Sequence, residues 1–63
     1  MNEPFISIIV PAYNSEKTIR KCVDSLLNLD YPCFEVIFID DGSLDRTKQI
    51  LFEYKNRLQV IES

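Results

Sequence analysis

The 63-residue sequence contains no histidine and only one glycine, Gly42. The absence of histidine excludes a histidine base, a histidine nucleophile relay and a histidine metal ligand. A dinucleotide-binding fingerprint needs several glycines between the first strand and its helix, and a P-loop needs Gly-Lys followed by Ser or Thr. The sequence has neither pattern, which argues against NAD-type and NTPase functions.

Basic residues are also few, with seven Lys and Arg against ten Asp and Glu and a net charge of -3. Scattered basic residues in an acidic chain argue against a nucleic-acid partner. The apolar run Phe5–Val10 is too short for a signal peptide, and no run approaches the roughly 18 apolar residues of a membrane helix. Cys22 and Cys33 form no CxxC motif. We therefore expect a cytoplasmic protein with reduced thiols and no membrane segment in this chain.

What the sequence does contain is an alternation of short apolar runs and helical patterns, with a hydrophobic content of 46% that is typical of globular proteins. Strands are predicted at Phe5–Val10, ending before Pro11, at Phe34–Ile39 and at Leu58–Ile61. Two sets of apolar positions at helical spacing lie between them: Ile19, Cys22, Val23, Leu26 and Leu27, then Thr47, Ile50, Leu51, Tyr54 and Leu58. The order β-α-β-α-β predicts an α/β fold with three parallel strands.

Polar residues mark the expected helix starts. Asn14 or Ser15 can cap the first helix, and Glu16 is favourable in its first turn. Asp45 is the expected cap of the second helix, with Ser43 as the alternative.

Right-handed crossovers have a consequence for the two faces of the sheet. If both crossovers step the same way, the strand order is 3-2-1 and both helices cover one face. The other face, which includes alternate residues of Ser7–Val10 and Val36–Ile39, then has no cover and is prone to association. We therefore expect residues 1–63 to form a single partial domain. The competing expectation is a short natural protein that dimerises through this face.

Polar residues follow the first two strands, in Pro11–Glu16 and in Asp40–Asp45. Ligands of open α/β sheets bind outside the carboxyl ends of the strands, where these two segments should lie side by side. Tyr13 offers a ring for stacking a heterocycle. A carboxylate accepts hydrogen bonds, which selects uracil N3–H or the N–H edge of guanine, and a second carboxylate can hold ribose hydroxyls. A diphosphate would need a divalent cation, because no glycine cradle is present.

Each candidate also has a purely structural interpretation. Tyr13 could pack over the end of the strand, and Glu16 could only complement the helix dipole. Asp40–Asp41 could form a solvated turn, and Asn14 could be a cap or turn former.

The segment Ile6–Ile61 resembles the N-terminal part of the family 2 glycosyltransferases, inverting enzymes of the GT-A (Rossmann-like) fold. Two motifs carry the resemblance: P-A-Y-N-x-E at Pro11–Glu16 and D-D-G-S-x-D at Asp40–Asp45. The resemblance implies a nucleotide-sugar donor, with a UDP-sugar preferred over a GDP-sugar, a Mg²⁺ or Mn²⁺ ion, and transfer of the sugar to an acceptor hydroxyl with inversion.

The resemblance also implies a set of nucleotide-binding residues: Pro11, Ala12, Tyr13, Glu16, Asp40 and Asp41. Pro11, Ala12 and Tyr13 line the base, with Tyr13 stacked on it, and Asp41 accepts the uracil N–H. Glu16 makes a further nucleoside contact, while Asp40 shapes the turn and reaches toward the nucleoside. The D-x-D metal motif and the catalytic base of the family lie beyond residue 63. The chain is therefore expected to bind donor without catalysing transfer, and membrane association of a full-length enzyme stays open.

Two functions of other classes are the alternatives. A non-catalytic interaction module would pair two copies through the uncovered sheet face. A receiver-like signalling domain also starts β-α-β-α-β and has an acidic Mg²⁺ pocket, but its acidic pair follows the first strand, whereas Asp40–Asp41 follows the second.

Overall fold

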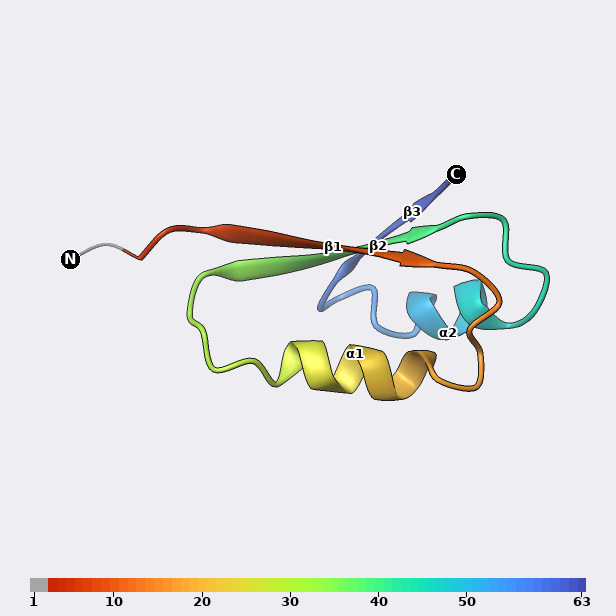
Figure 1. Ribbon diagram of the computed structural model, residues 1–63, viewed down its shortest axis with the longest axis horizontal. Helices are drawn as coiled ribbons and strands as arrows, with labels where there is room; N and C mark the ends of the chain where they lie inside the picture. The colour runs from red at the N-terminus through yellow and green to blue at the C-terminus, as the bar shows by residue number, and fades with distance from the viewer. Residues whose placement is uncertain (1–2) are drawn as a thin grey trace.

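The fold is an α/β arrangement of three strands and two helices, and the computed structural model describes residues 3–63 (Figure 1). The elements in chain order are β1 (Ile6–Ala12), α1 (Ile19–Leu27), β2 (Phe34–Asp40), α2 (Thr47–Phe52) and β3 (Gln59–Glu62). This order confirms the predicted β-α-β-α-β topology.

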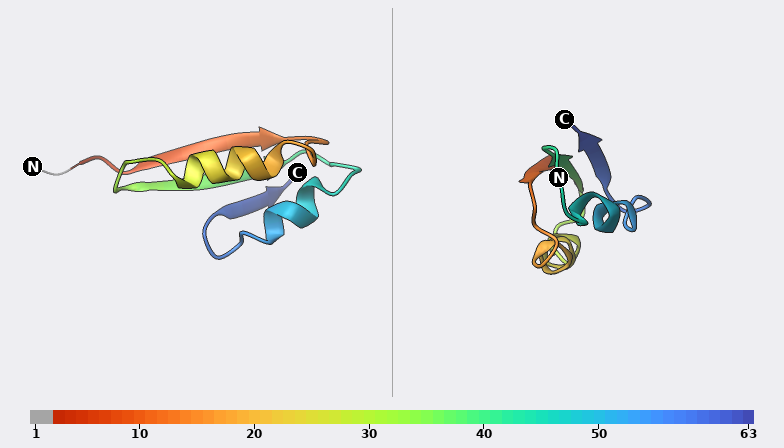
Figure 2. Two further views of the ribbon diagram at one scale, coloured as in Figure 1. Left: turned by 90° about the horizontal axis from the view of Figure 1, so that it is seen from below. Right: turned by 90° about the vertical axis from the view of Figure 1, so that its right-hand side faces the viewer.

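The three strands are parallel, and β2 lies between β1 and β3. This is the order expected if both crossovers step the same way. Figure 2 shows the result, since α1 and α2 lie on the same side of the sheet. The register pairs Ala12 with Asp40 and Asp40 with Glu62, so the carboxyl ends of all three strands meet at one edge.

The core lies between the sheet and the two helices. Side chains of β2 alternate, so Val36, Phe38 and Asp40 are buried on the helix side. The other buried apolar residues come from β1, from both helices and from the turn before β3: Ala12, Ile19, Val23, Ile50, Leu51 and Leu58. Cys22 and Cys33 are free thiols, as expected, and both are partly buried.

Within the described residues 3–63, no helix covers the opposite face of the sheet. Ile9 is 59% exposed and Ile61 is 48% exposed, and both belong to the strand positions that alternate with the core. Toward the amino ends of the strands, this face is polar instead. There the Glu35 carboxylate accepts hydrogen bonds from the hydroxyl of Ser7 and the amide of Gln59. The predicted uncovered face is therefore present and is apolar toward the carboxyl ends of the strands.

All three predicted strand ends are too early. Strands β2 and β3 run one residue further than expected, to Asp40 and Glu62. Strand β1 does not stop at Pro11 but runs to Ala12. The Ile6 N–H and the Ala12 carbonyl both bond toward the β2 side. Hydrogen-bonding direction alternates along a strand, so Pro11, one residue before Ala12, faces the open edge of the sheet. A proline is tolerated there because its missing N–H breaks no ladder bond.

Two helix boundaries also differ from those predicted. Helix α1 begins at Ile19, later than expected, because residues 16–18 form a turn. Asn14 has a φ of 46°, outside the right-handed helical region. Helix α2 ends at Phe52, after which Glu53 N–H and Tyr54 N–H bond three residues back in tighter turns. Among residues 3–63, no helix has the length and apolar character needed to cross a membrane.

Candidate functional site

The segments that follow β1 and β2 lie side by side at the carboxyl edge of the sheet (Figure 1). The Asp41 N–H donates to the Ala12 carbonyl at 3.0 Å, which extends the β1–β2 pairing by one step into the loops. The predicted juxtaposition of Pro11–Glu16 with Asp40–Asp45 is therefore correct.

The aromatic ring and one carboxylate are open to solvent at this edge. Tyr13 is 56% exposed, so much of its surface is open to solvent. Asp41 is also exposed. Pro11 is exposed too, on the sheet face opposite the buried Ala12. A planar ligand would therefore have access to both the Tyr13 ring and the Asp41 carboxylate.

Asp40 has a different environment from its neighbour. It is only 3% exposed, on the helix side of the sheet, and its Oδ1 accepts a hydrogen bond from the Ser43 hydroxyl. The Ser43 oxygen in turn accepts the Asn14 N–H at 3.0 Å. The Asp40 carboxylate therefore links the end of β2 to Ser43 in the following turn.

Asn14 joins the two loops and does not cap α1. Its Oδ1 accepts the Leu44 N–H at 2.8 Å, across 30 residues of sequence. The cap position of α1 is Thr18, which makes no side-chain cap hydrogen bond. Ser15 does not cap it either, because its hydroxyl donates to the Tyr13 carbonyl at 3.0 Å. The positive φ of Asn14 is compatible with the turn-forming role that the sequence allowed.

Asp45 lies one residue before the cap position of α2, which is Arg46 and not Asp45 as predicted. Asp45 still satisfies the helix start, because its Oδ1 accepts the Thr47 N–H at 2.9 Å. Its Oδ2 accepts the Glu16 N–H at 3.2 Å. Partial desolvation alone would raise the pKa of Asp45, but hydrogen bonds from the Thr47 hydroxyl and from backbone N–H groups outweigh it and lower that pKa.

Glu16 also bridges the loops. Its Oε1 accepts the Arg46 N–H at 3.2 Å, while the Glu16 N–H binds the Asp45 carboxylate. The two segments therefore exchange carboxylate–amide hydrogen bonds in both directions. A ligand contact by Glu16 would fall to its second oxygen, Oε2.

Thr47 is a site component that the sequence did not reveal. It was expected only as an apolar-stripe position of the helix, yet its hydroxyl accepts the Ser15 N–H at 2.6 Å. A Thr at the first turn of a helix after an acidic loop is too common a pattern to have predicted this bond.

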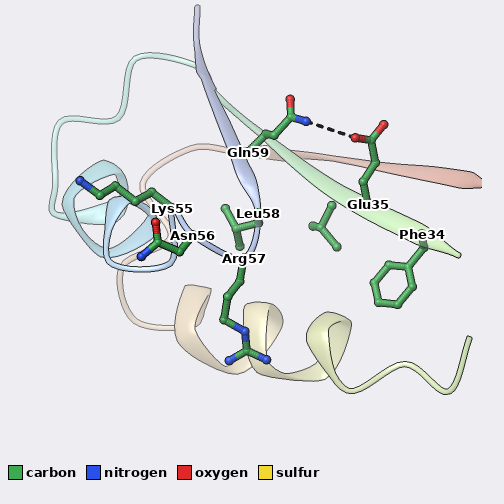
Figure 3. A pocket seen from close by; sticks show the side chains of 8 residues that line it. Phe34, Glu35, Lys55, Asn56, Arg57, Leu58 and Gln59 are labelled. Atoms are coloured by element: carbon green, nitrogen blue, oxygen red, sulfur yellow. Dashed lines mark hydrogen bonds between the residues drawn. The ribbon is translucent and has the colours of Figure 1, made fainter. Parts of the chain in front are cut away.

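A cavity lies at the opposite, amino end of the strands, away from this site (Figure 3). It is formed by the starts of β2 and β3 and by the turn between α2 and β3. Figure 3 shows that Lys55 and Arg57 on its rim point in different directions. Within residues 3–63, no group of three or more His, Cys, Asp and Glu side chains could hold a metal ion.

Several glycosyltransferases of known activity are similar to this chain. The poly(ribitol-phosphate) beta-N-acetylglucosaminyltransferase TarS of Staphylococcus aureus is 48% identical over 56 residues, covering 86% of this chain and 10% of TarS. The chondroitin synthase of Escherichia coli is 49% identical over 58 residues, covering 90% of this chain and 8% of the synthase. The chain therefore spans about a tenth of the length of these relatives.

Crystal structures of glycosyltransferases are also similar to this chain. The crystal structure of Staphylococcus aureus TarS 1-349 in complex with UDP-GlcNAc superimposes with a TM-score of 0.79 at 45% identity, covering 95% of this chain and 18% of that one. Glucosyl-3-phosphoglycerate synthase from Mycobacterium tuberculosis, in complex with Mn²⁺, UDP and phosphoglyceric acid, gives 0.72 at 33% identity, covering 92% and 20%. These matches confirm the predicted GT-A fold for this segment.

The family assignment rests on the length of the match as well as on the motifs. The family model described as Glycosyl transferase family 2 matches residues 7–63, which include both loops of the candidate site. The chain therefore belongs to glycosyl transferase family 2.

Proposed function

We propose that this chain forms the nucleoside-binding part of an inverting glycosyltransferase that moves a sugar from a nucleotide-sugar donor, preferably a UDP-sugar, to an acceptor hydroxyl. The observation that carries the proposal is the exposed pair of Tyr13 and Asp41 on two loops that hydrogen bonds hold together. Membership of the family supports it, as do the similar structures that contain UDP-GlcNAc or UDP. The coverage of about a tenth of the relatives supports a partial domain within a longer protein.

The residues have distinct parts in this proposal. Tyr13 stacks on the base, which contributes about 1–3 kcal/mol by analogy with other base–aromatic contacts. Asp41 accepts the uracil N3–H, and a GDP-sugar is the alternative donor because guanine also presents N–H groups. Pro11 and Ala12 line the base, Ala12 through its backbone because its side chain is buried, and the Ala12 carbonyl also accepts the Asp41 N–H.

Two carboxylates support the site from its sides. Asp40 shapes the turn through Ser43, and Glu16 contacts the nucleoside through the oxygen that does not accept from Arg46. No catalytic base is assigned within these residues; the family resemblance puts the group that deprotonates the acceptor beyond residue 63.

The proposal includes a Mg²⁺ or Mn²⁺ ion for the donor diphosphate, with ligands outside this chain. Support comes from the mycobacterial synthase structure, which contains Mn²⁺ together with UDP. The described residues offer no ligand set for such an ion, so no step is assigned to it here.

Titration of the protein with UDP by NMR tests the donor site, with Mg²⁺ as the diamagnetic ion and GDP for comparison. We expect shifts confined to Ala12–Glu16 and Asp40–Ser43. Asp41→Asn should weaken UDP binding about tenfold, because asparagine keeps an acceptor oxygen but loses the charge that strengthens the hydrogen bond from the base. Asp30→Asn, an exposed carboxylate in the loop before β2, is the matched control and should bind as wild type. Equal binding by Asp41→Asn would remove Asp41 from the site.

The alternatives have less support. The receiver-like function has none, because the acidic pair follows β2 and the chain belongs to a glycosyltransferase family. An interaction module is favoured by one observation, the apolar sheet face with Ile9 and Ile61 exposed. It would show self-association without any dependence on nucleotide.

A further inference from the structure

The hydroxyl of Thr47 lies at the centre of the contact between the two loops. Thr47 is fully buried, with 0% exposure, although it carries a polar group. Its oxygen accepts the Ser15 N–H at 2.6 Å, and its hydrogen is donated to Asp45 Oδ1. One buried hydroxyl thus joins the loop after β1 to the acidic residue that precedes α2.

The bond from Ser15 reaches the part of the first loop that carries the aromatic ring. Ser15 is two residues from Tyr13, and the Ser15 hydroxyl donates to the Tyr13 carbonyl at 3.0 Å. The Ser15 carbonyl accepts the Ile19 N–H at 2.8 Å, which starts the first turn of α1. Fixing Ser15 therefore fixes the backbone on both sides of it.

The bond to Asp45 reaches the second loop. Asp45 Oδ1 accepts hydrogen bonds from Thr47, and Asp45 Oδ2 accepts one from the Glu16 N–H. The Glu16 carboxylate in turn accepts the Arg46 N–H. These contacts join the two loops through side chains, beyond the single backbone bond between Asp41 and Ala12.

We infer that Thr47 is a positioning residue for the donor site, an inference that rests on the proposed function. It fixes the spacing between the loop that carries Tyr13 and the loop that carries Asp41 before ligand arrives. A base that stacks on Tyr13 and hydrogen-bonds to Asp41 needs the two side chains at a fixed distance from each other. If the loops already hold that distance, less conformational entropy is lost when the nucleotide binds. Because Thr47 is fully buried, it would act through its hydrogen bonds and not by direct contact with the ligand.

The substitutions Thr47→Ser and Thr47→Val separate the hydroxyl from the packing. Serine keeps the hydroxyl and loses a methyl group, while valine keeps the shape and loses both hydrogen bonds. UDP affinity is measured by NMR titration or calorimetry, and unfolding by urea reports stability in the same samples. We expect Thr47→Ser to bind UDP within about twofold of wild type and Thr47→Val to bind about five- to tenfold more weakly, while still folded.

A folded Thr47→Val protein that binds UDP as tightly as wild type overturns the inference and leaves the proposed function intact. Equal weakening by Thr47→Ser and Thr47→Val also overturns it, because packing and not the hydroxyl would then be responsible. Failure of the wild-type protein to bind UDP overturns the proposed function and this inference with it.

If Thr47→Val does not fold, the pair Thr47→Ser and Thr47→Ala tests the same hydroxyl, because these two side chains differ by that group alone. We expect Thr47→Ala to bind UDP about five- to tenfold more weakly than Thr47→Ser, with a shift of the ligand-free Ser15 amide signal only in Thr47→Ala. Equal UDP affinity of the two variants, or an unmoved Ser15 signal in Thr47→Ala, overturns the inference.

Discussion

At the residue scale, the adjacent carboxylates Asp40 and Asp41 do two different things. Side chains alternate along a strand, so Asp40 at the end of β2 points to the helix side, whereas the next residue, Asp41, is exposed to solvent. The inner carboxylate accepts the Ser43 hydroxyl, and the outer one is available to a ligand. The repulsion expected of two neighbouring charges is therefore reduced by separation onto opposite sides of the backbone.

Gly42 follows this pair with a φ of 73°, in the left-handed region that other residues avoid. A Cβ at this position would meet nothing within 4 Å, so the cost of substitution is conformational and not steric. Gly42→Ala should lower the free energy of unfolding by about 1 kcal/mol, and Gly42→Asn by less, since Asn tolerates this region better. Urea denaturation of both variants measures this, and an alanine variant as stable as wild type would contradict it.

Asp45 makes stability depend on pH. Because its folded pKa is lowered, the ionised carboxylate contributes stability that is present at neutral pH and is lost as pH falls through about 4 and below. Asp45→Asn should be less stable at neutral pH and should lose less stability on acidification. Glu53, whose pKa is lowered by the hydrogen bond from Arg20, leaves a residual slope in the same direction. The free energy of unfolding, measured between about pH 3 and pH 7, is the readout. Parallel profiles for variant and wild type would rule out this role for Asp45.

At the scale of the elements, hydrophobic periodicity predicted the three strands and two helices correctly. Boundaries predicted from local residue types, such as proline and cap residues, were wrong in several places. Pro11 suggested a strand end, because the sequence does not show that its nitrogen faces an open sheet edge. Asn14 suggested a helix cap, because its true partner, the Leu44 N–H, is 30 residues away. The juxtaposition of the two motif loops followed from parallel topology alone. The hydrogen bonds of Thr47 between the loops could not be predicted in this way, because a bond from a side chain to a distant backbone group produces no pattern in the sequence.

Helix α2 illustrates how much of a short element depends on burial. It has six residues, too few to be stable by helix propensity, so its packing must hold it. Leu51 is fully buried, and Leu51→Ala should lower the free energy of unfolding by about 2–5 kcal/mol. That is comparable with the whole stability of a domain of this size, so the variant should be largely unfolded.

The neighbouring Phe52, 41% exposed in the same helix, is the matched control for Leu51. Phe52→Ala should cost clearly less, because much of its surface stays in water in the folded state. Circular dichroism during thermal unfolding distinguishes the two. Similar losses from Leu51→Ala and Phe52→Ala would mean that burial does not hold this helix.

At the scale of the whole molecule, the placement of both helices on one side determines where the chain is vulnerable. The functional loops lie at the carboxyl edge, whereas the apolar residues of the uncovered face lie across the sheet from the helices (Figure 2). The strand β1 also has an open edge. Both features favour contact with a further protein surface, either from the same polypeptide or from another copy.

Self-association through this face is the prediction for the chain by itself. Sedimentation should show a dimer or larger species whose fraction rises with concentration, because association removes the exposed part of Ile9 and Ile61 from water. Ile9→Lys should shift the protein toward monomer, since pairing would then bury a charge. Leu44→Lys is the control, because Leu44 is 87% exposed but lies in the loop before α2, off this face. If Leu44→Lys dissociates the species as effectively as Ile9→Lys, the contact is not made by the sheet face.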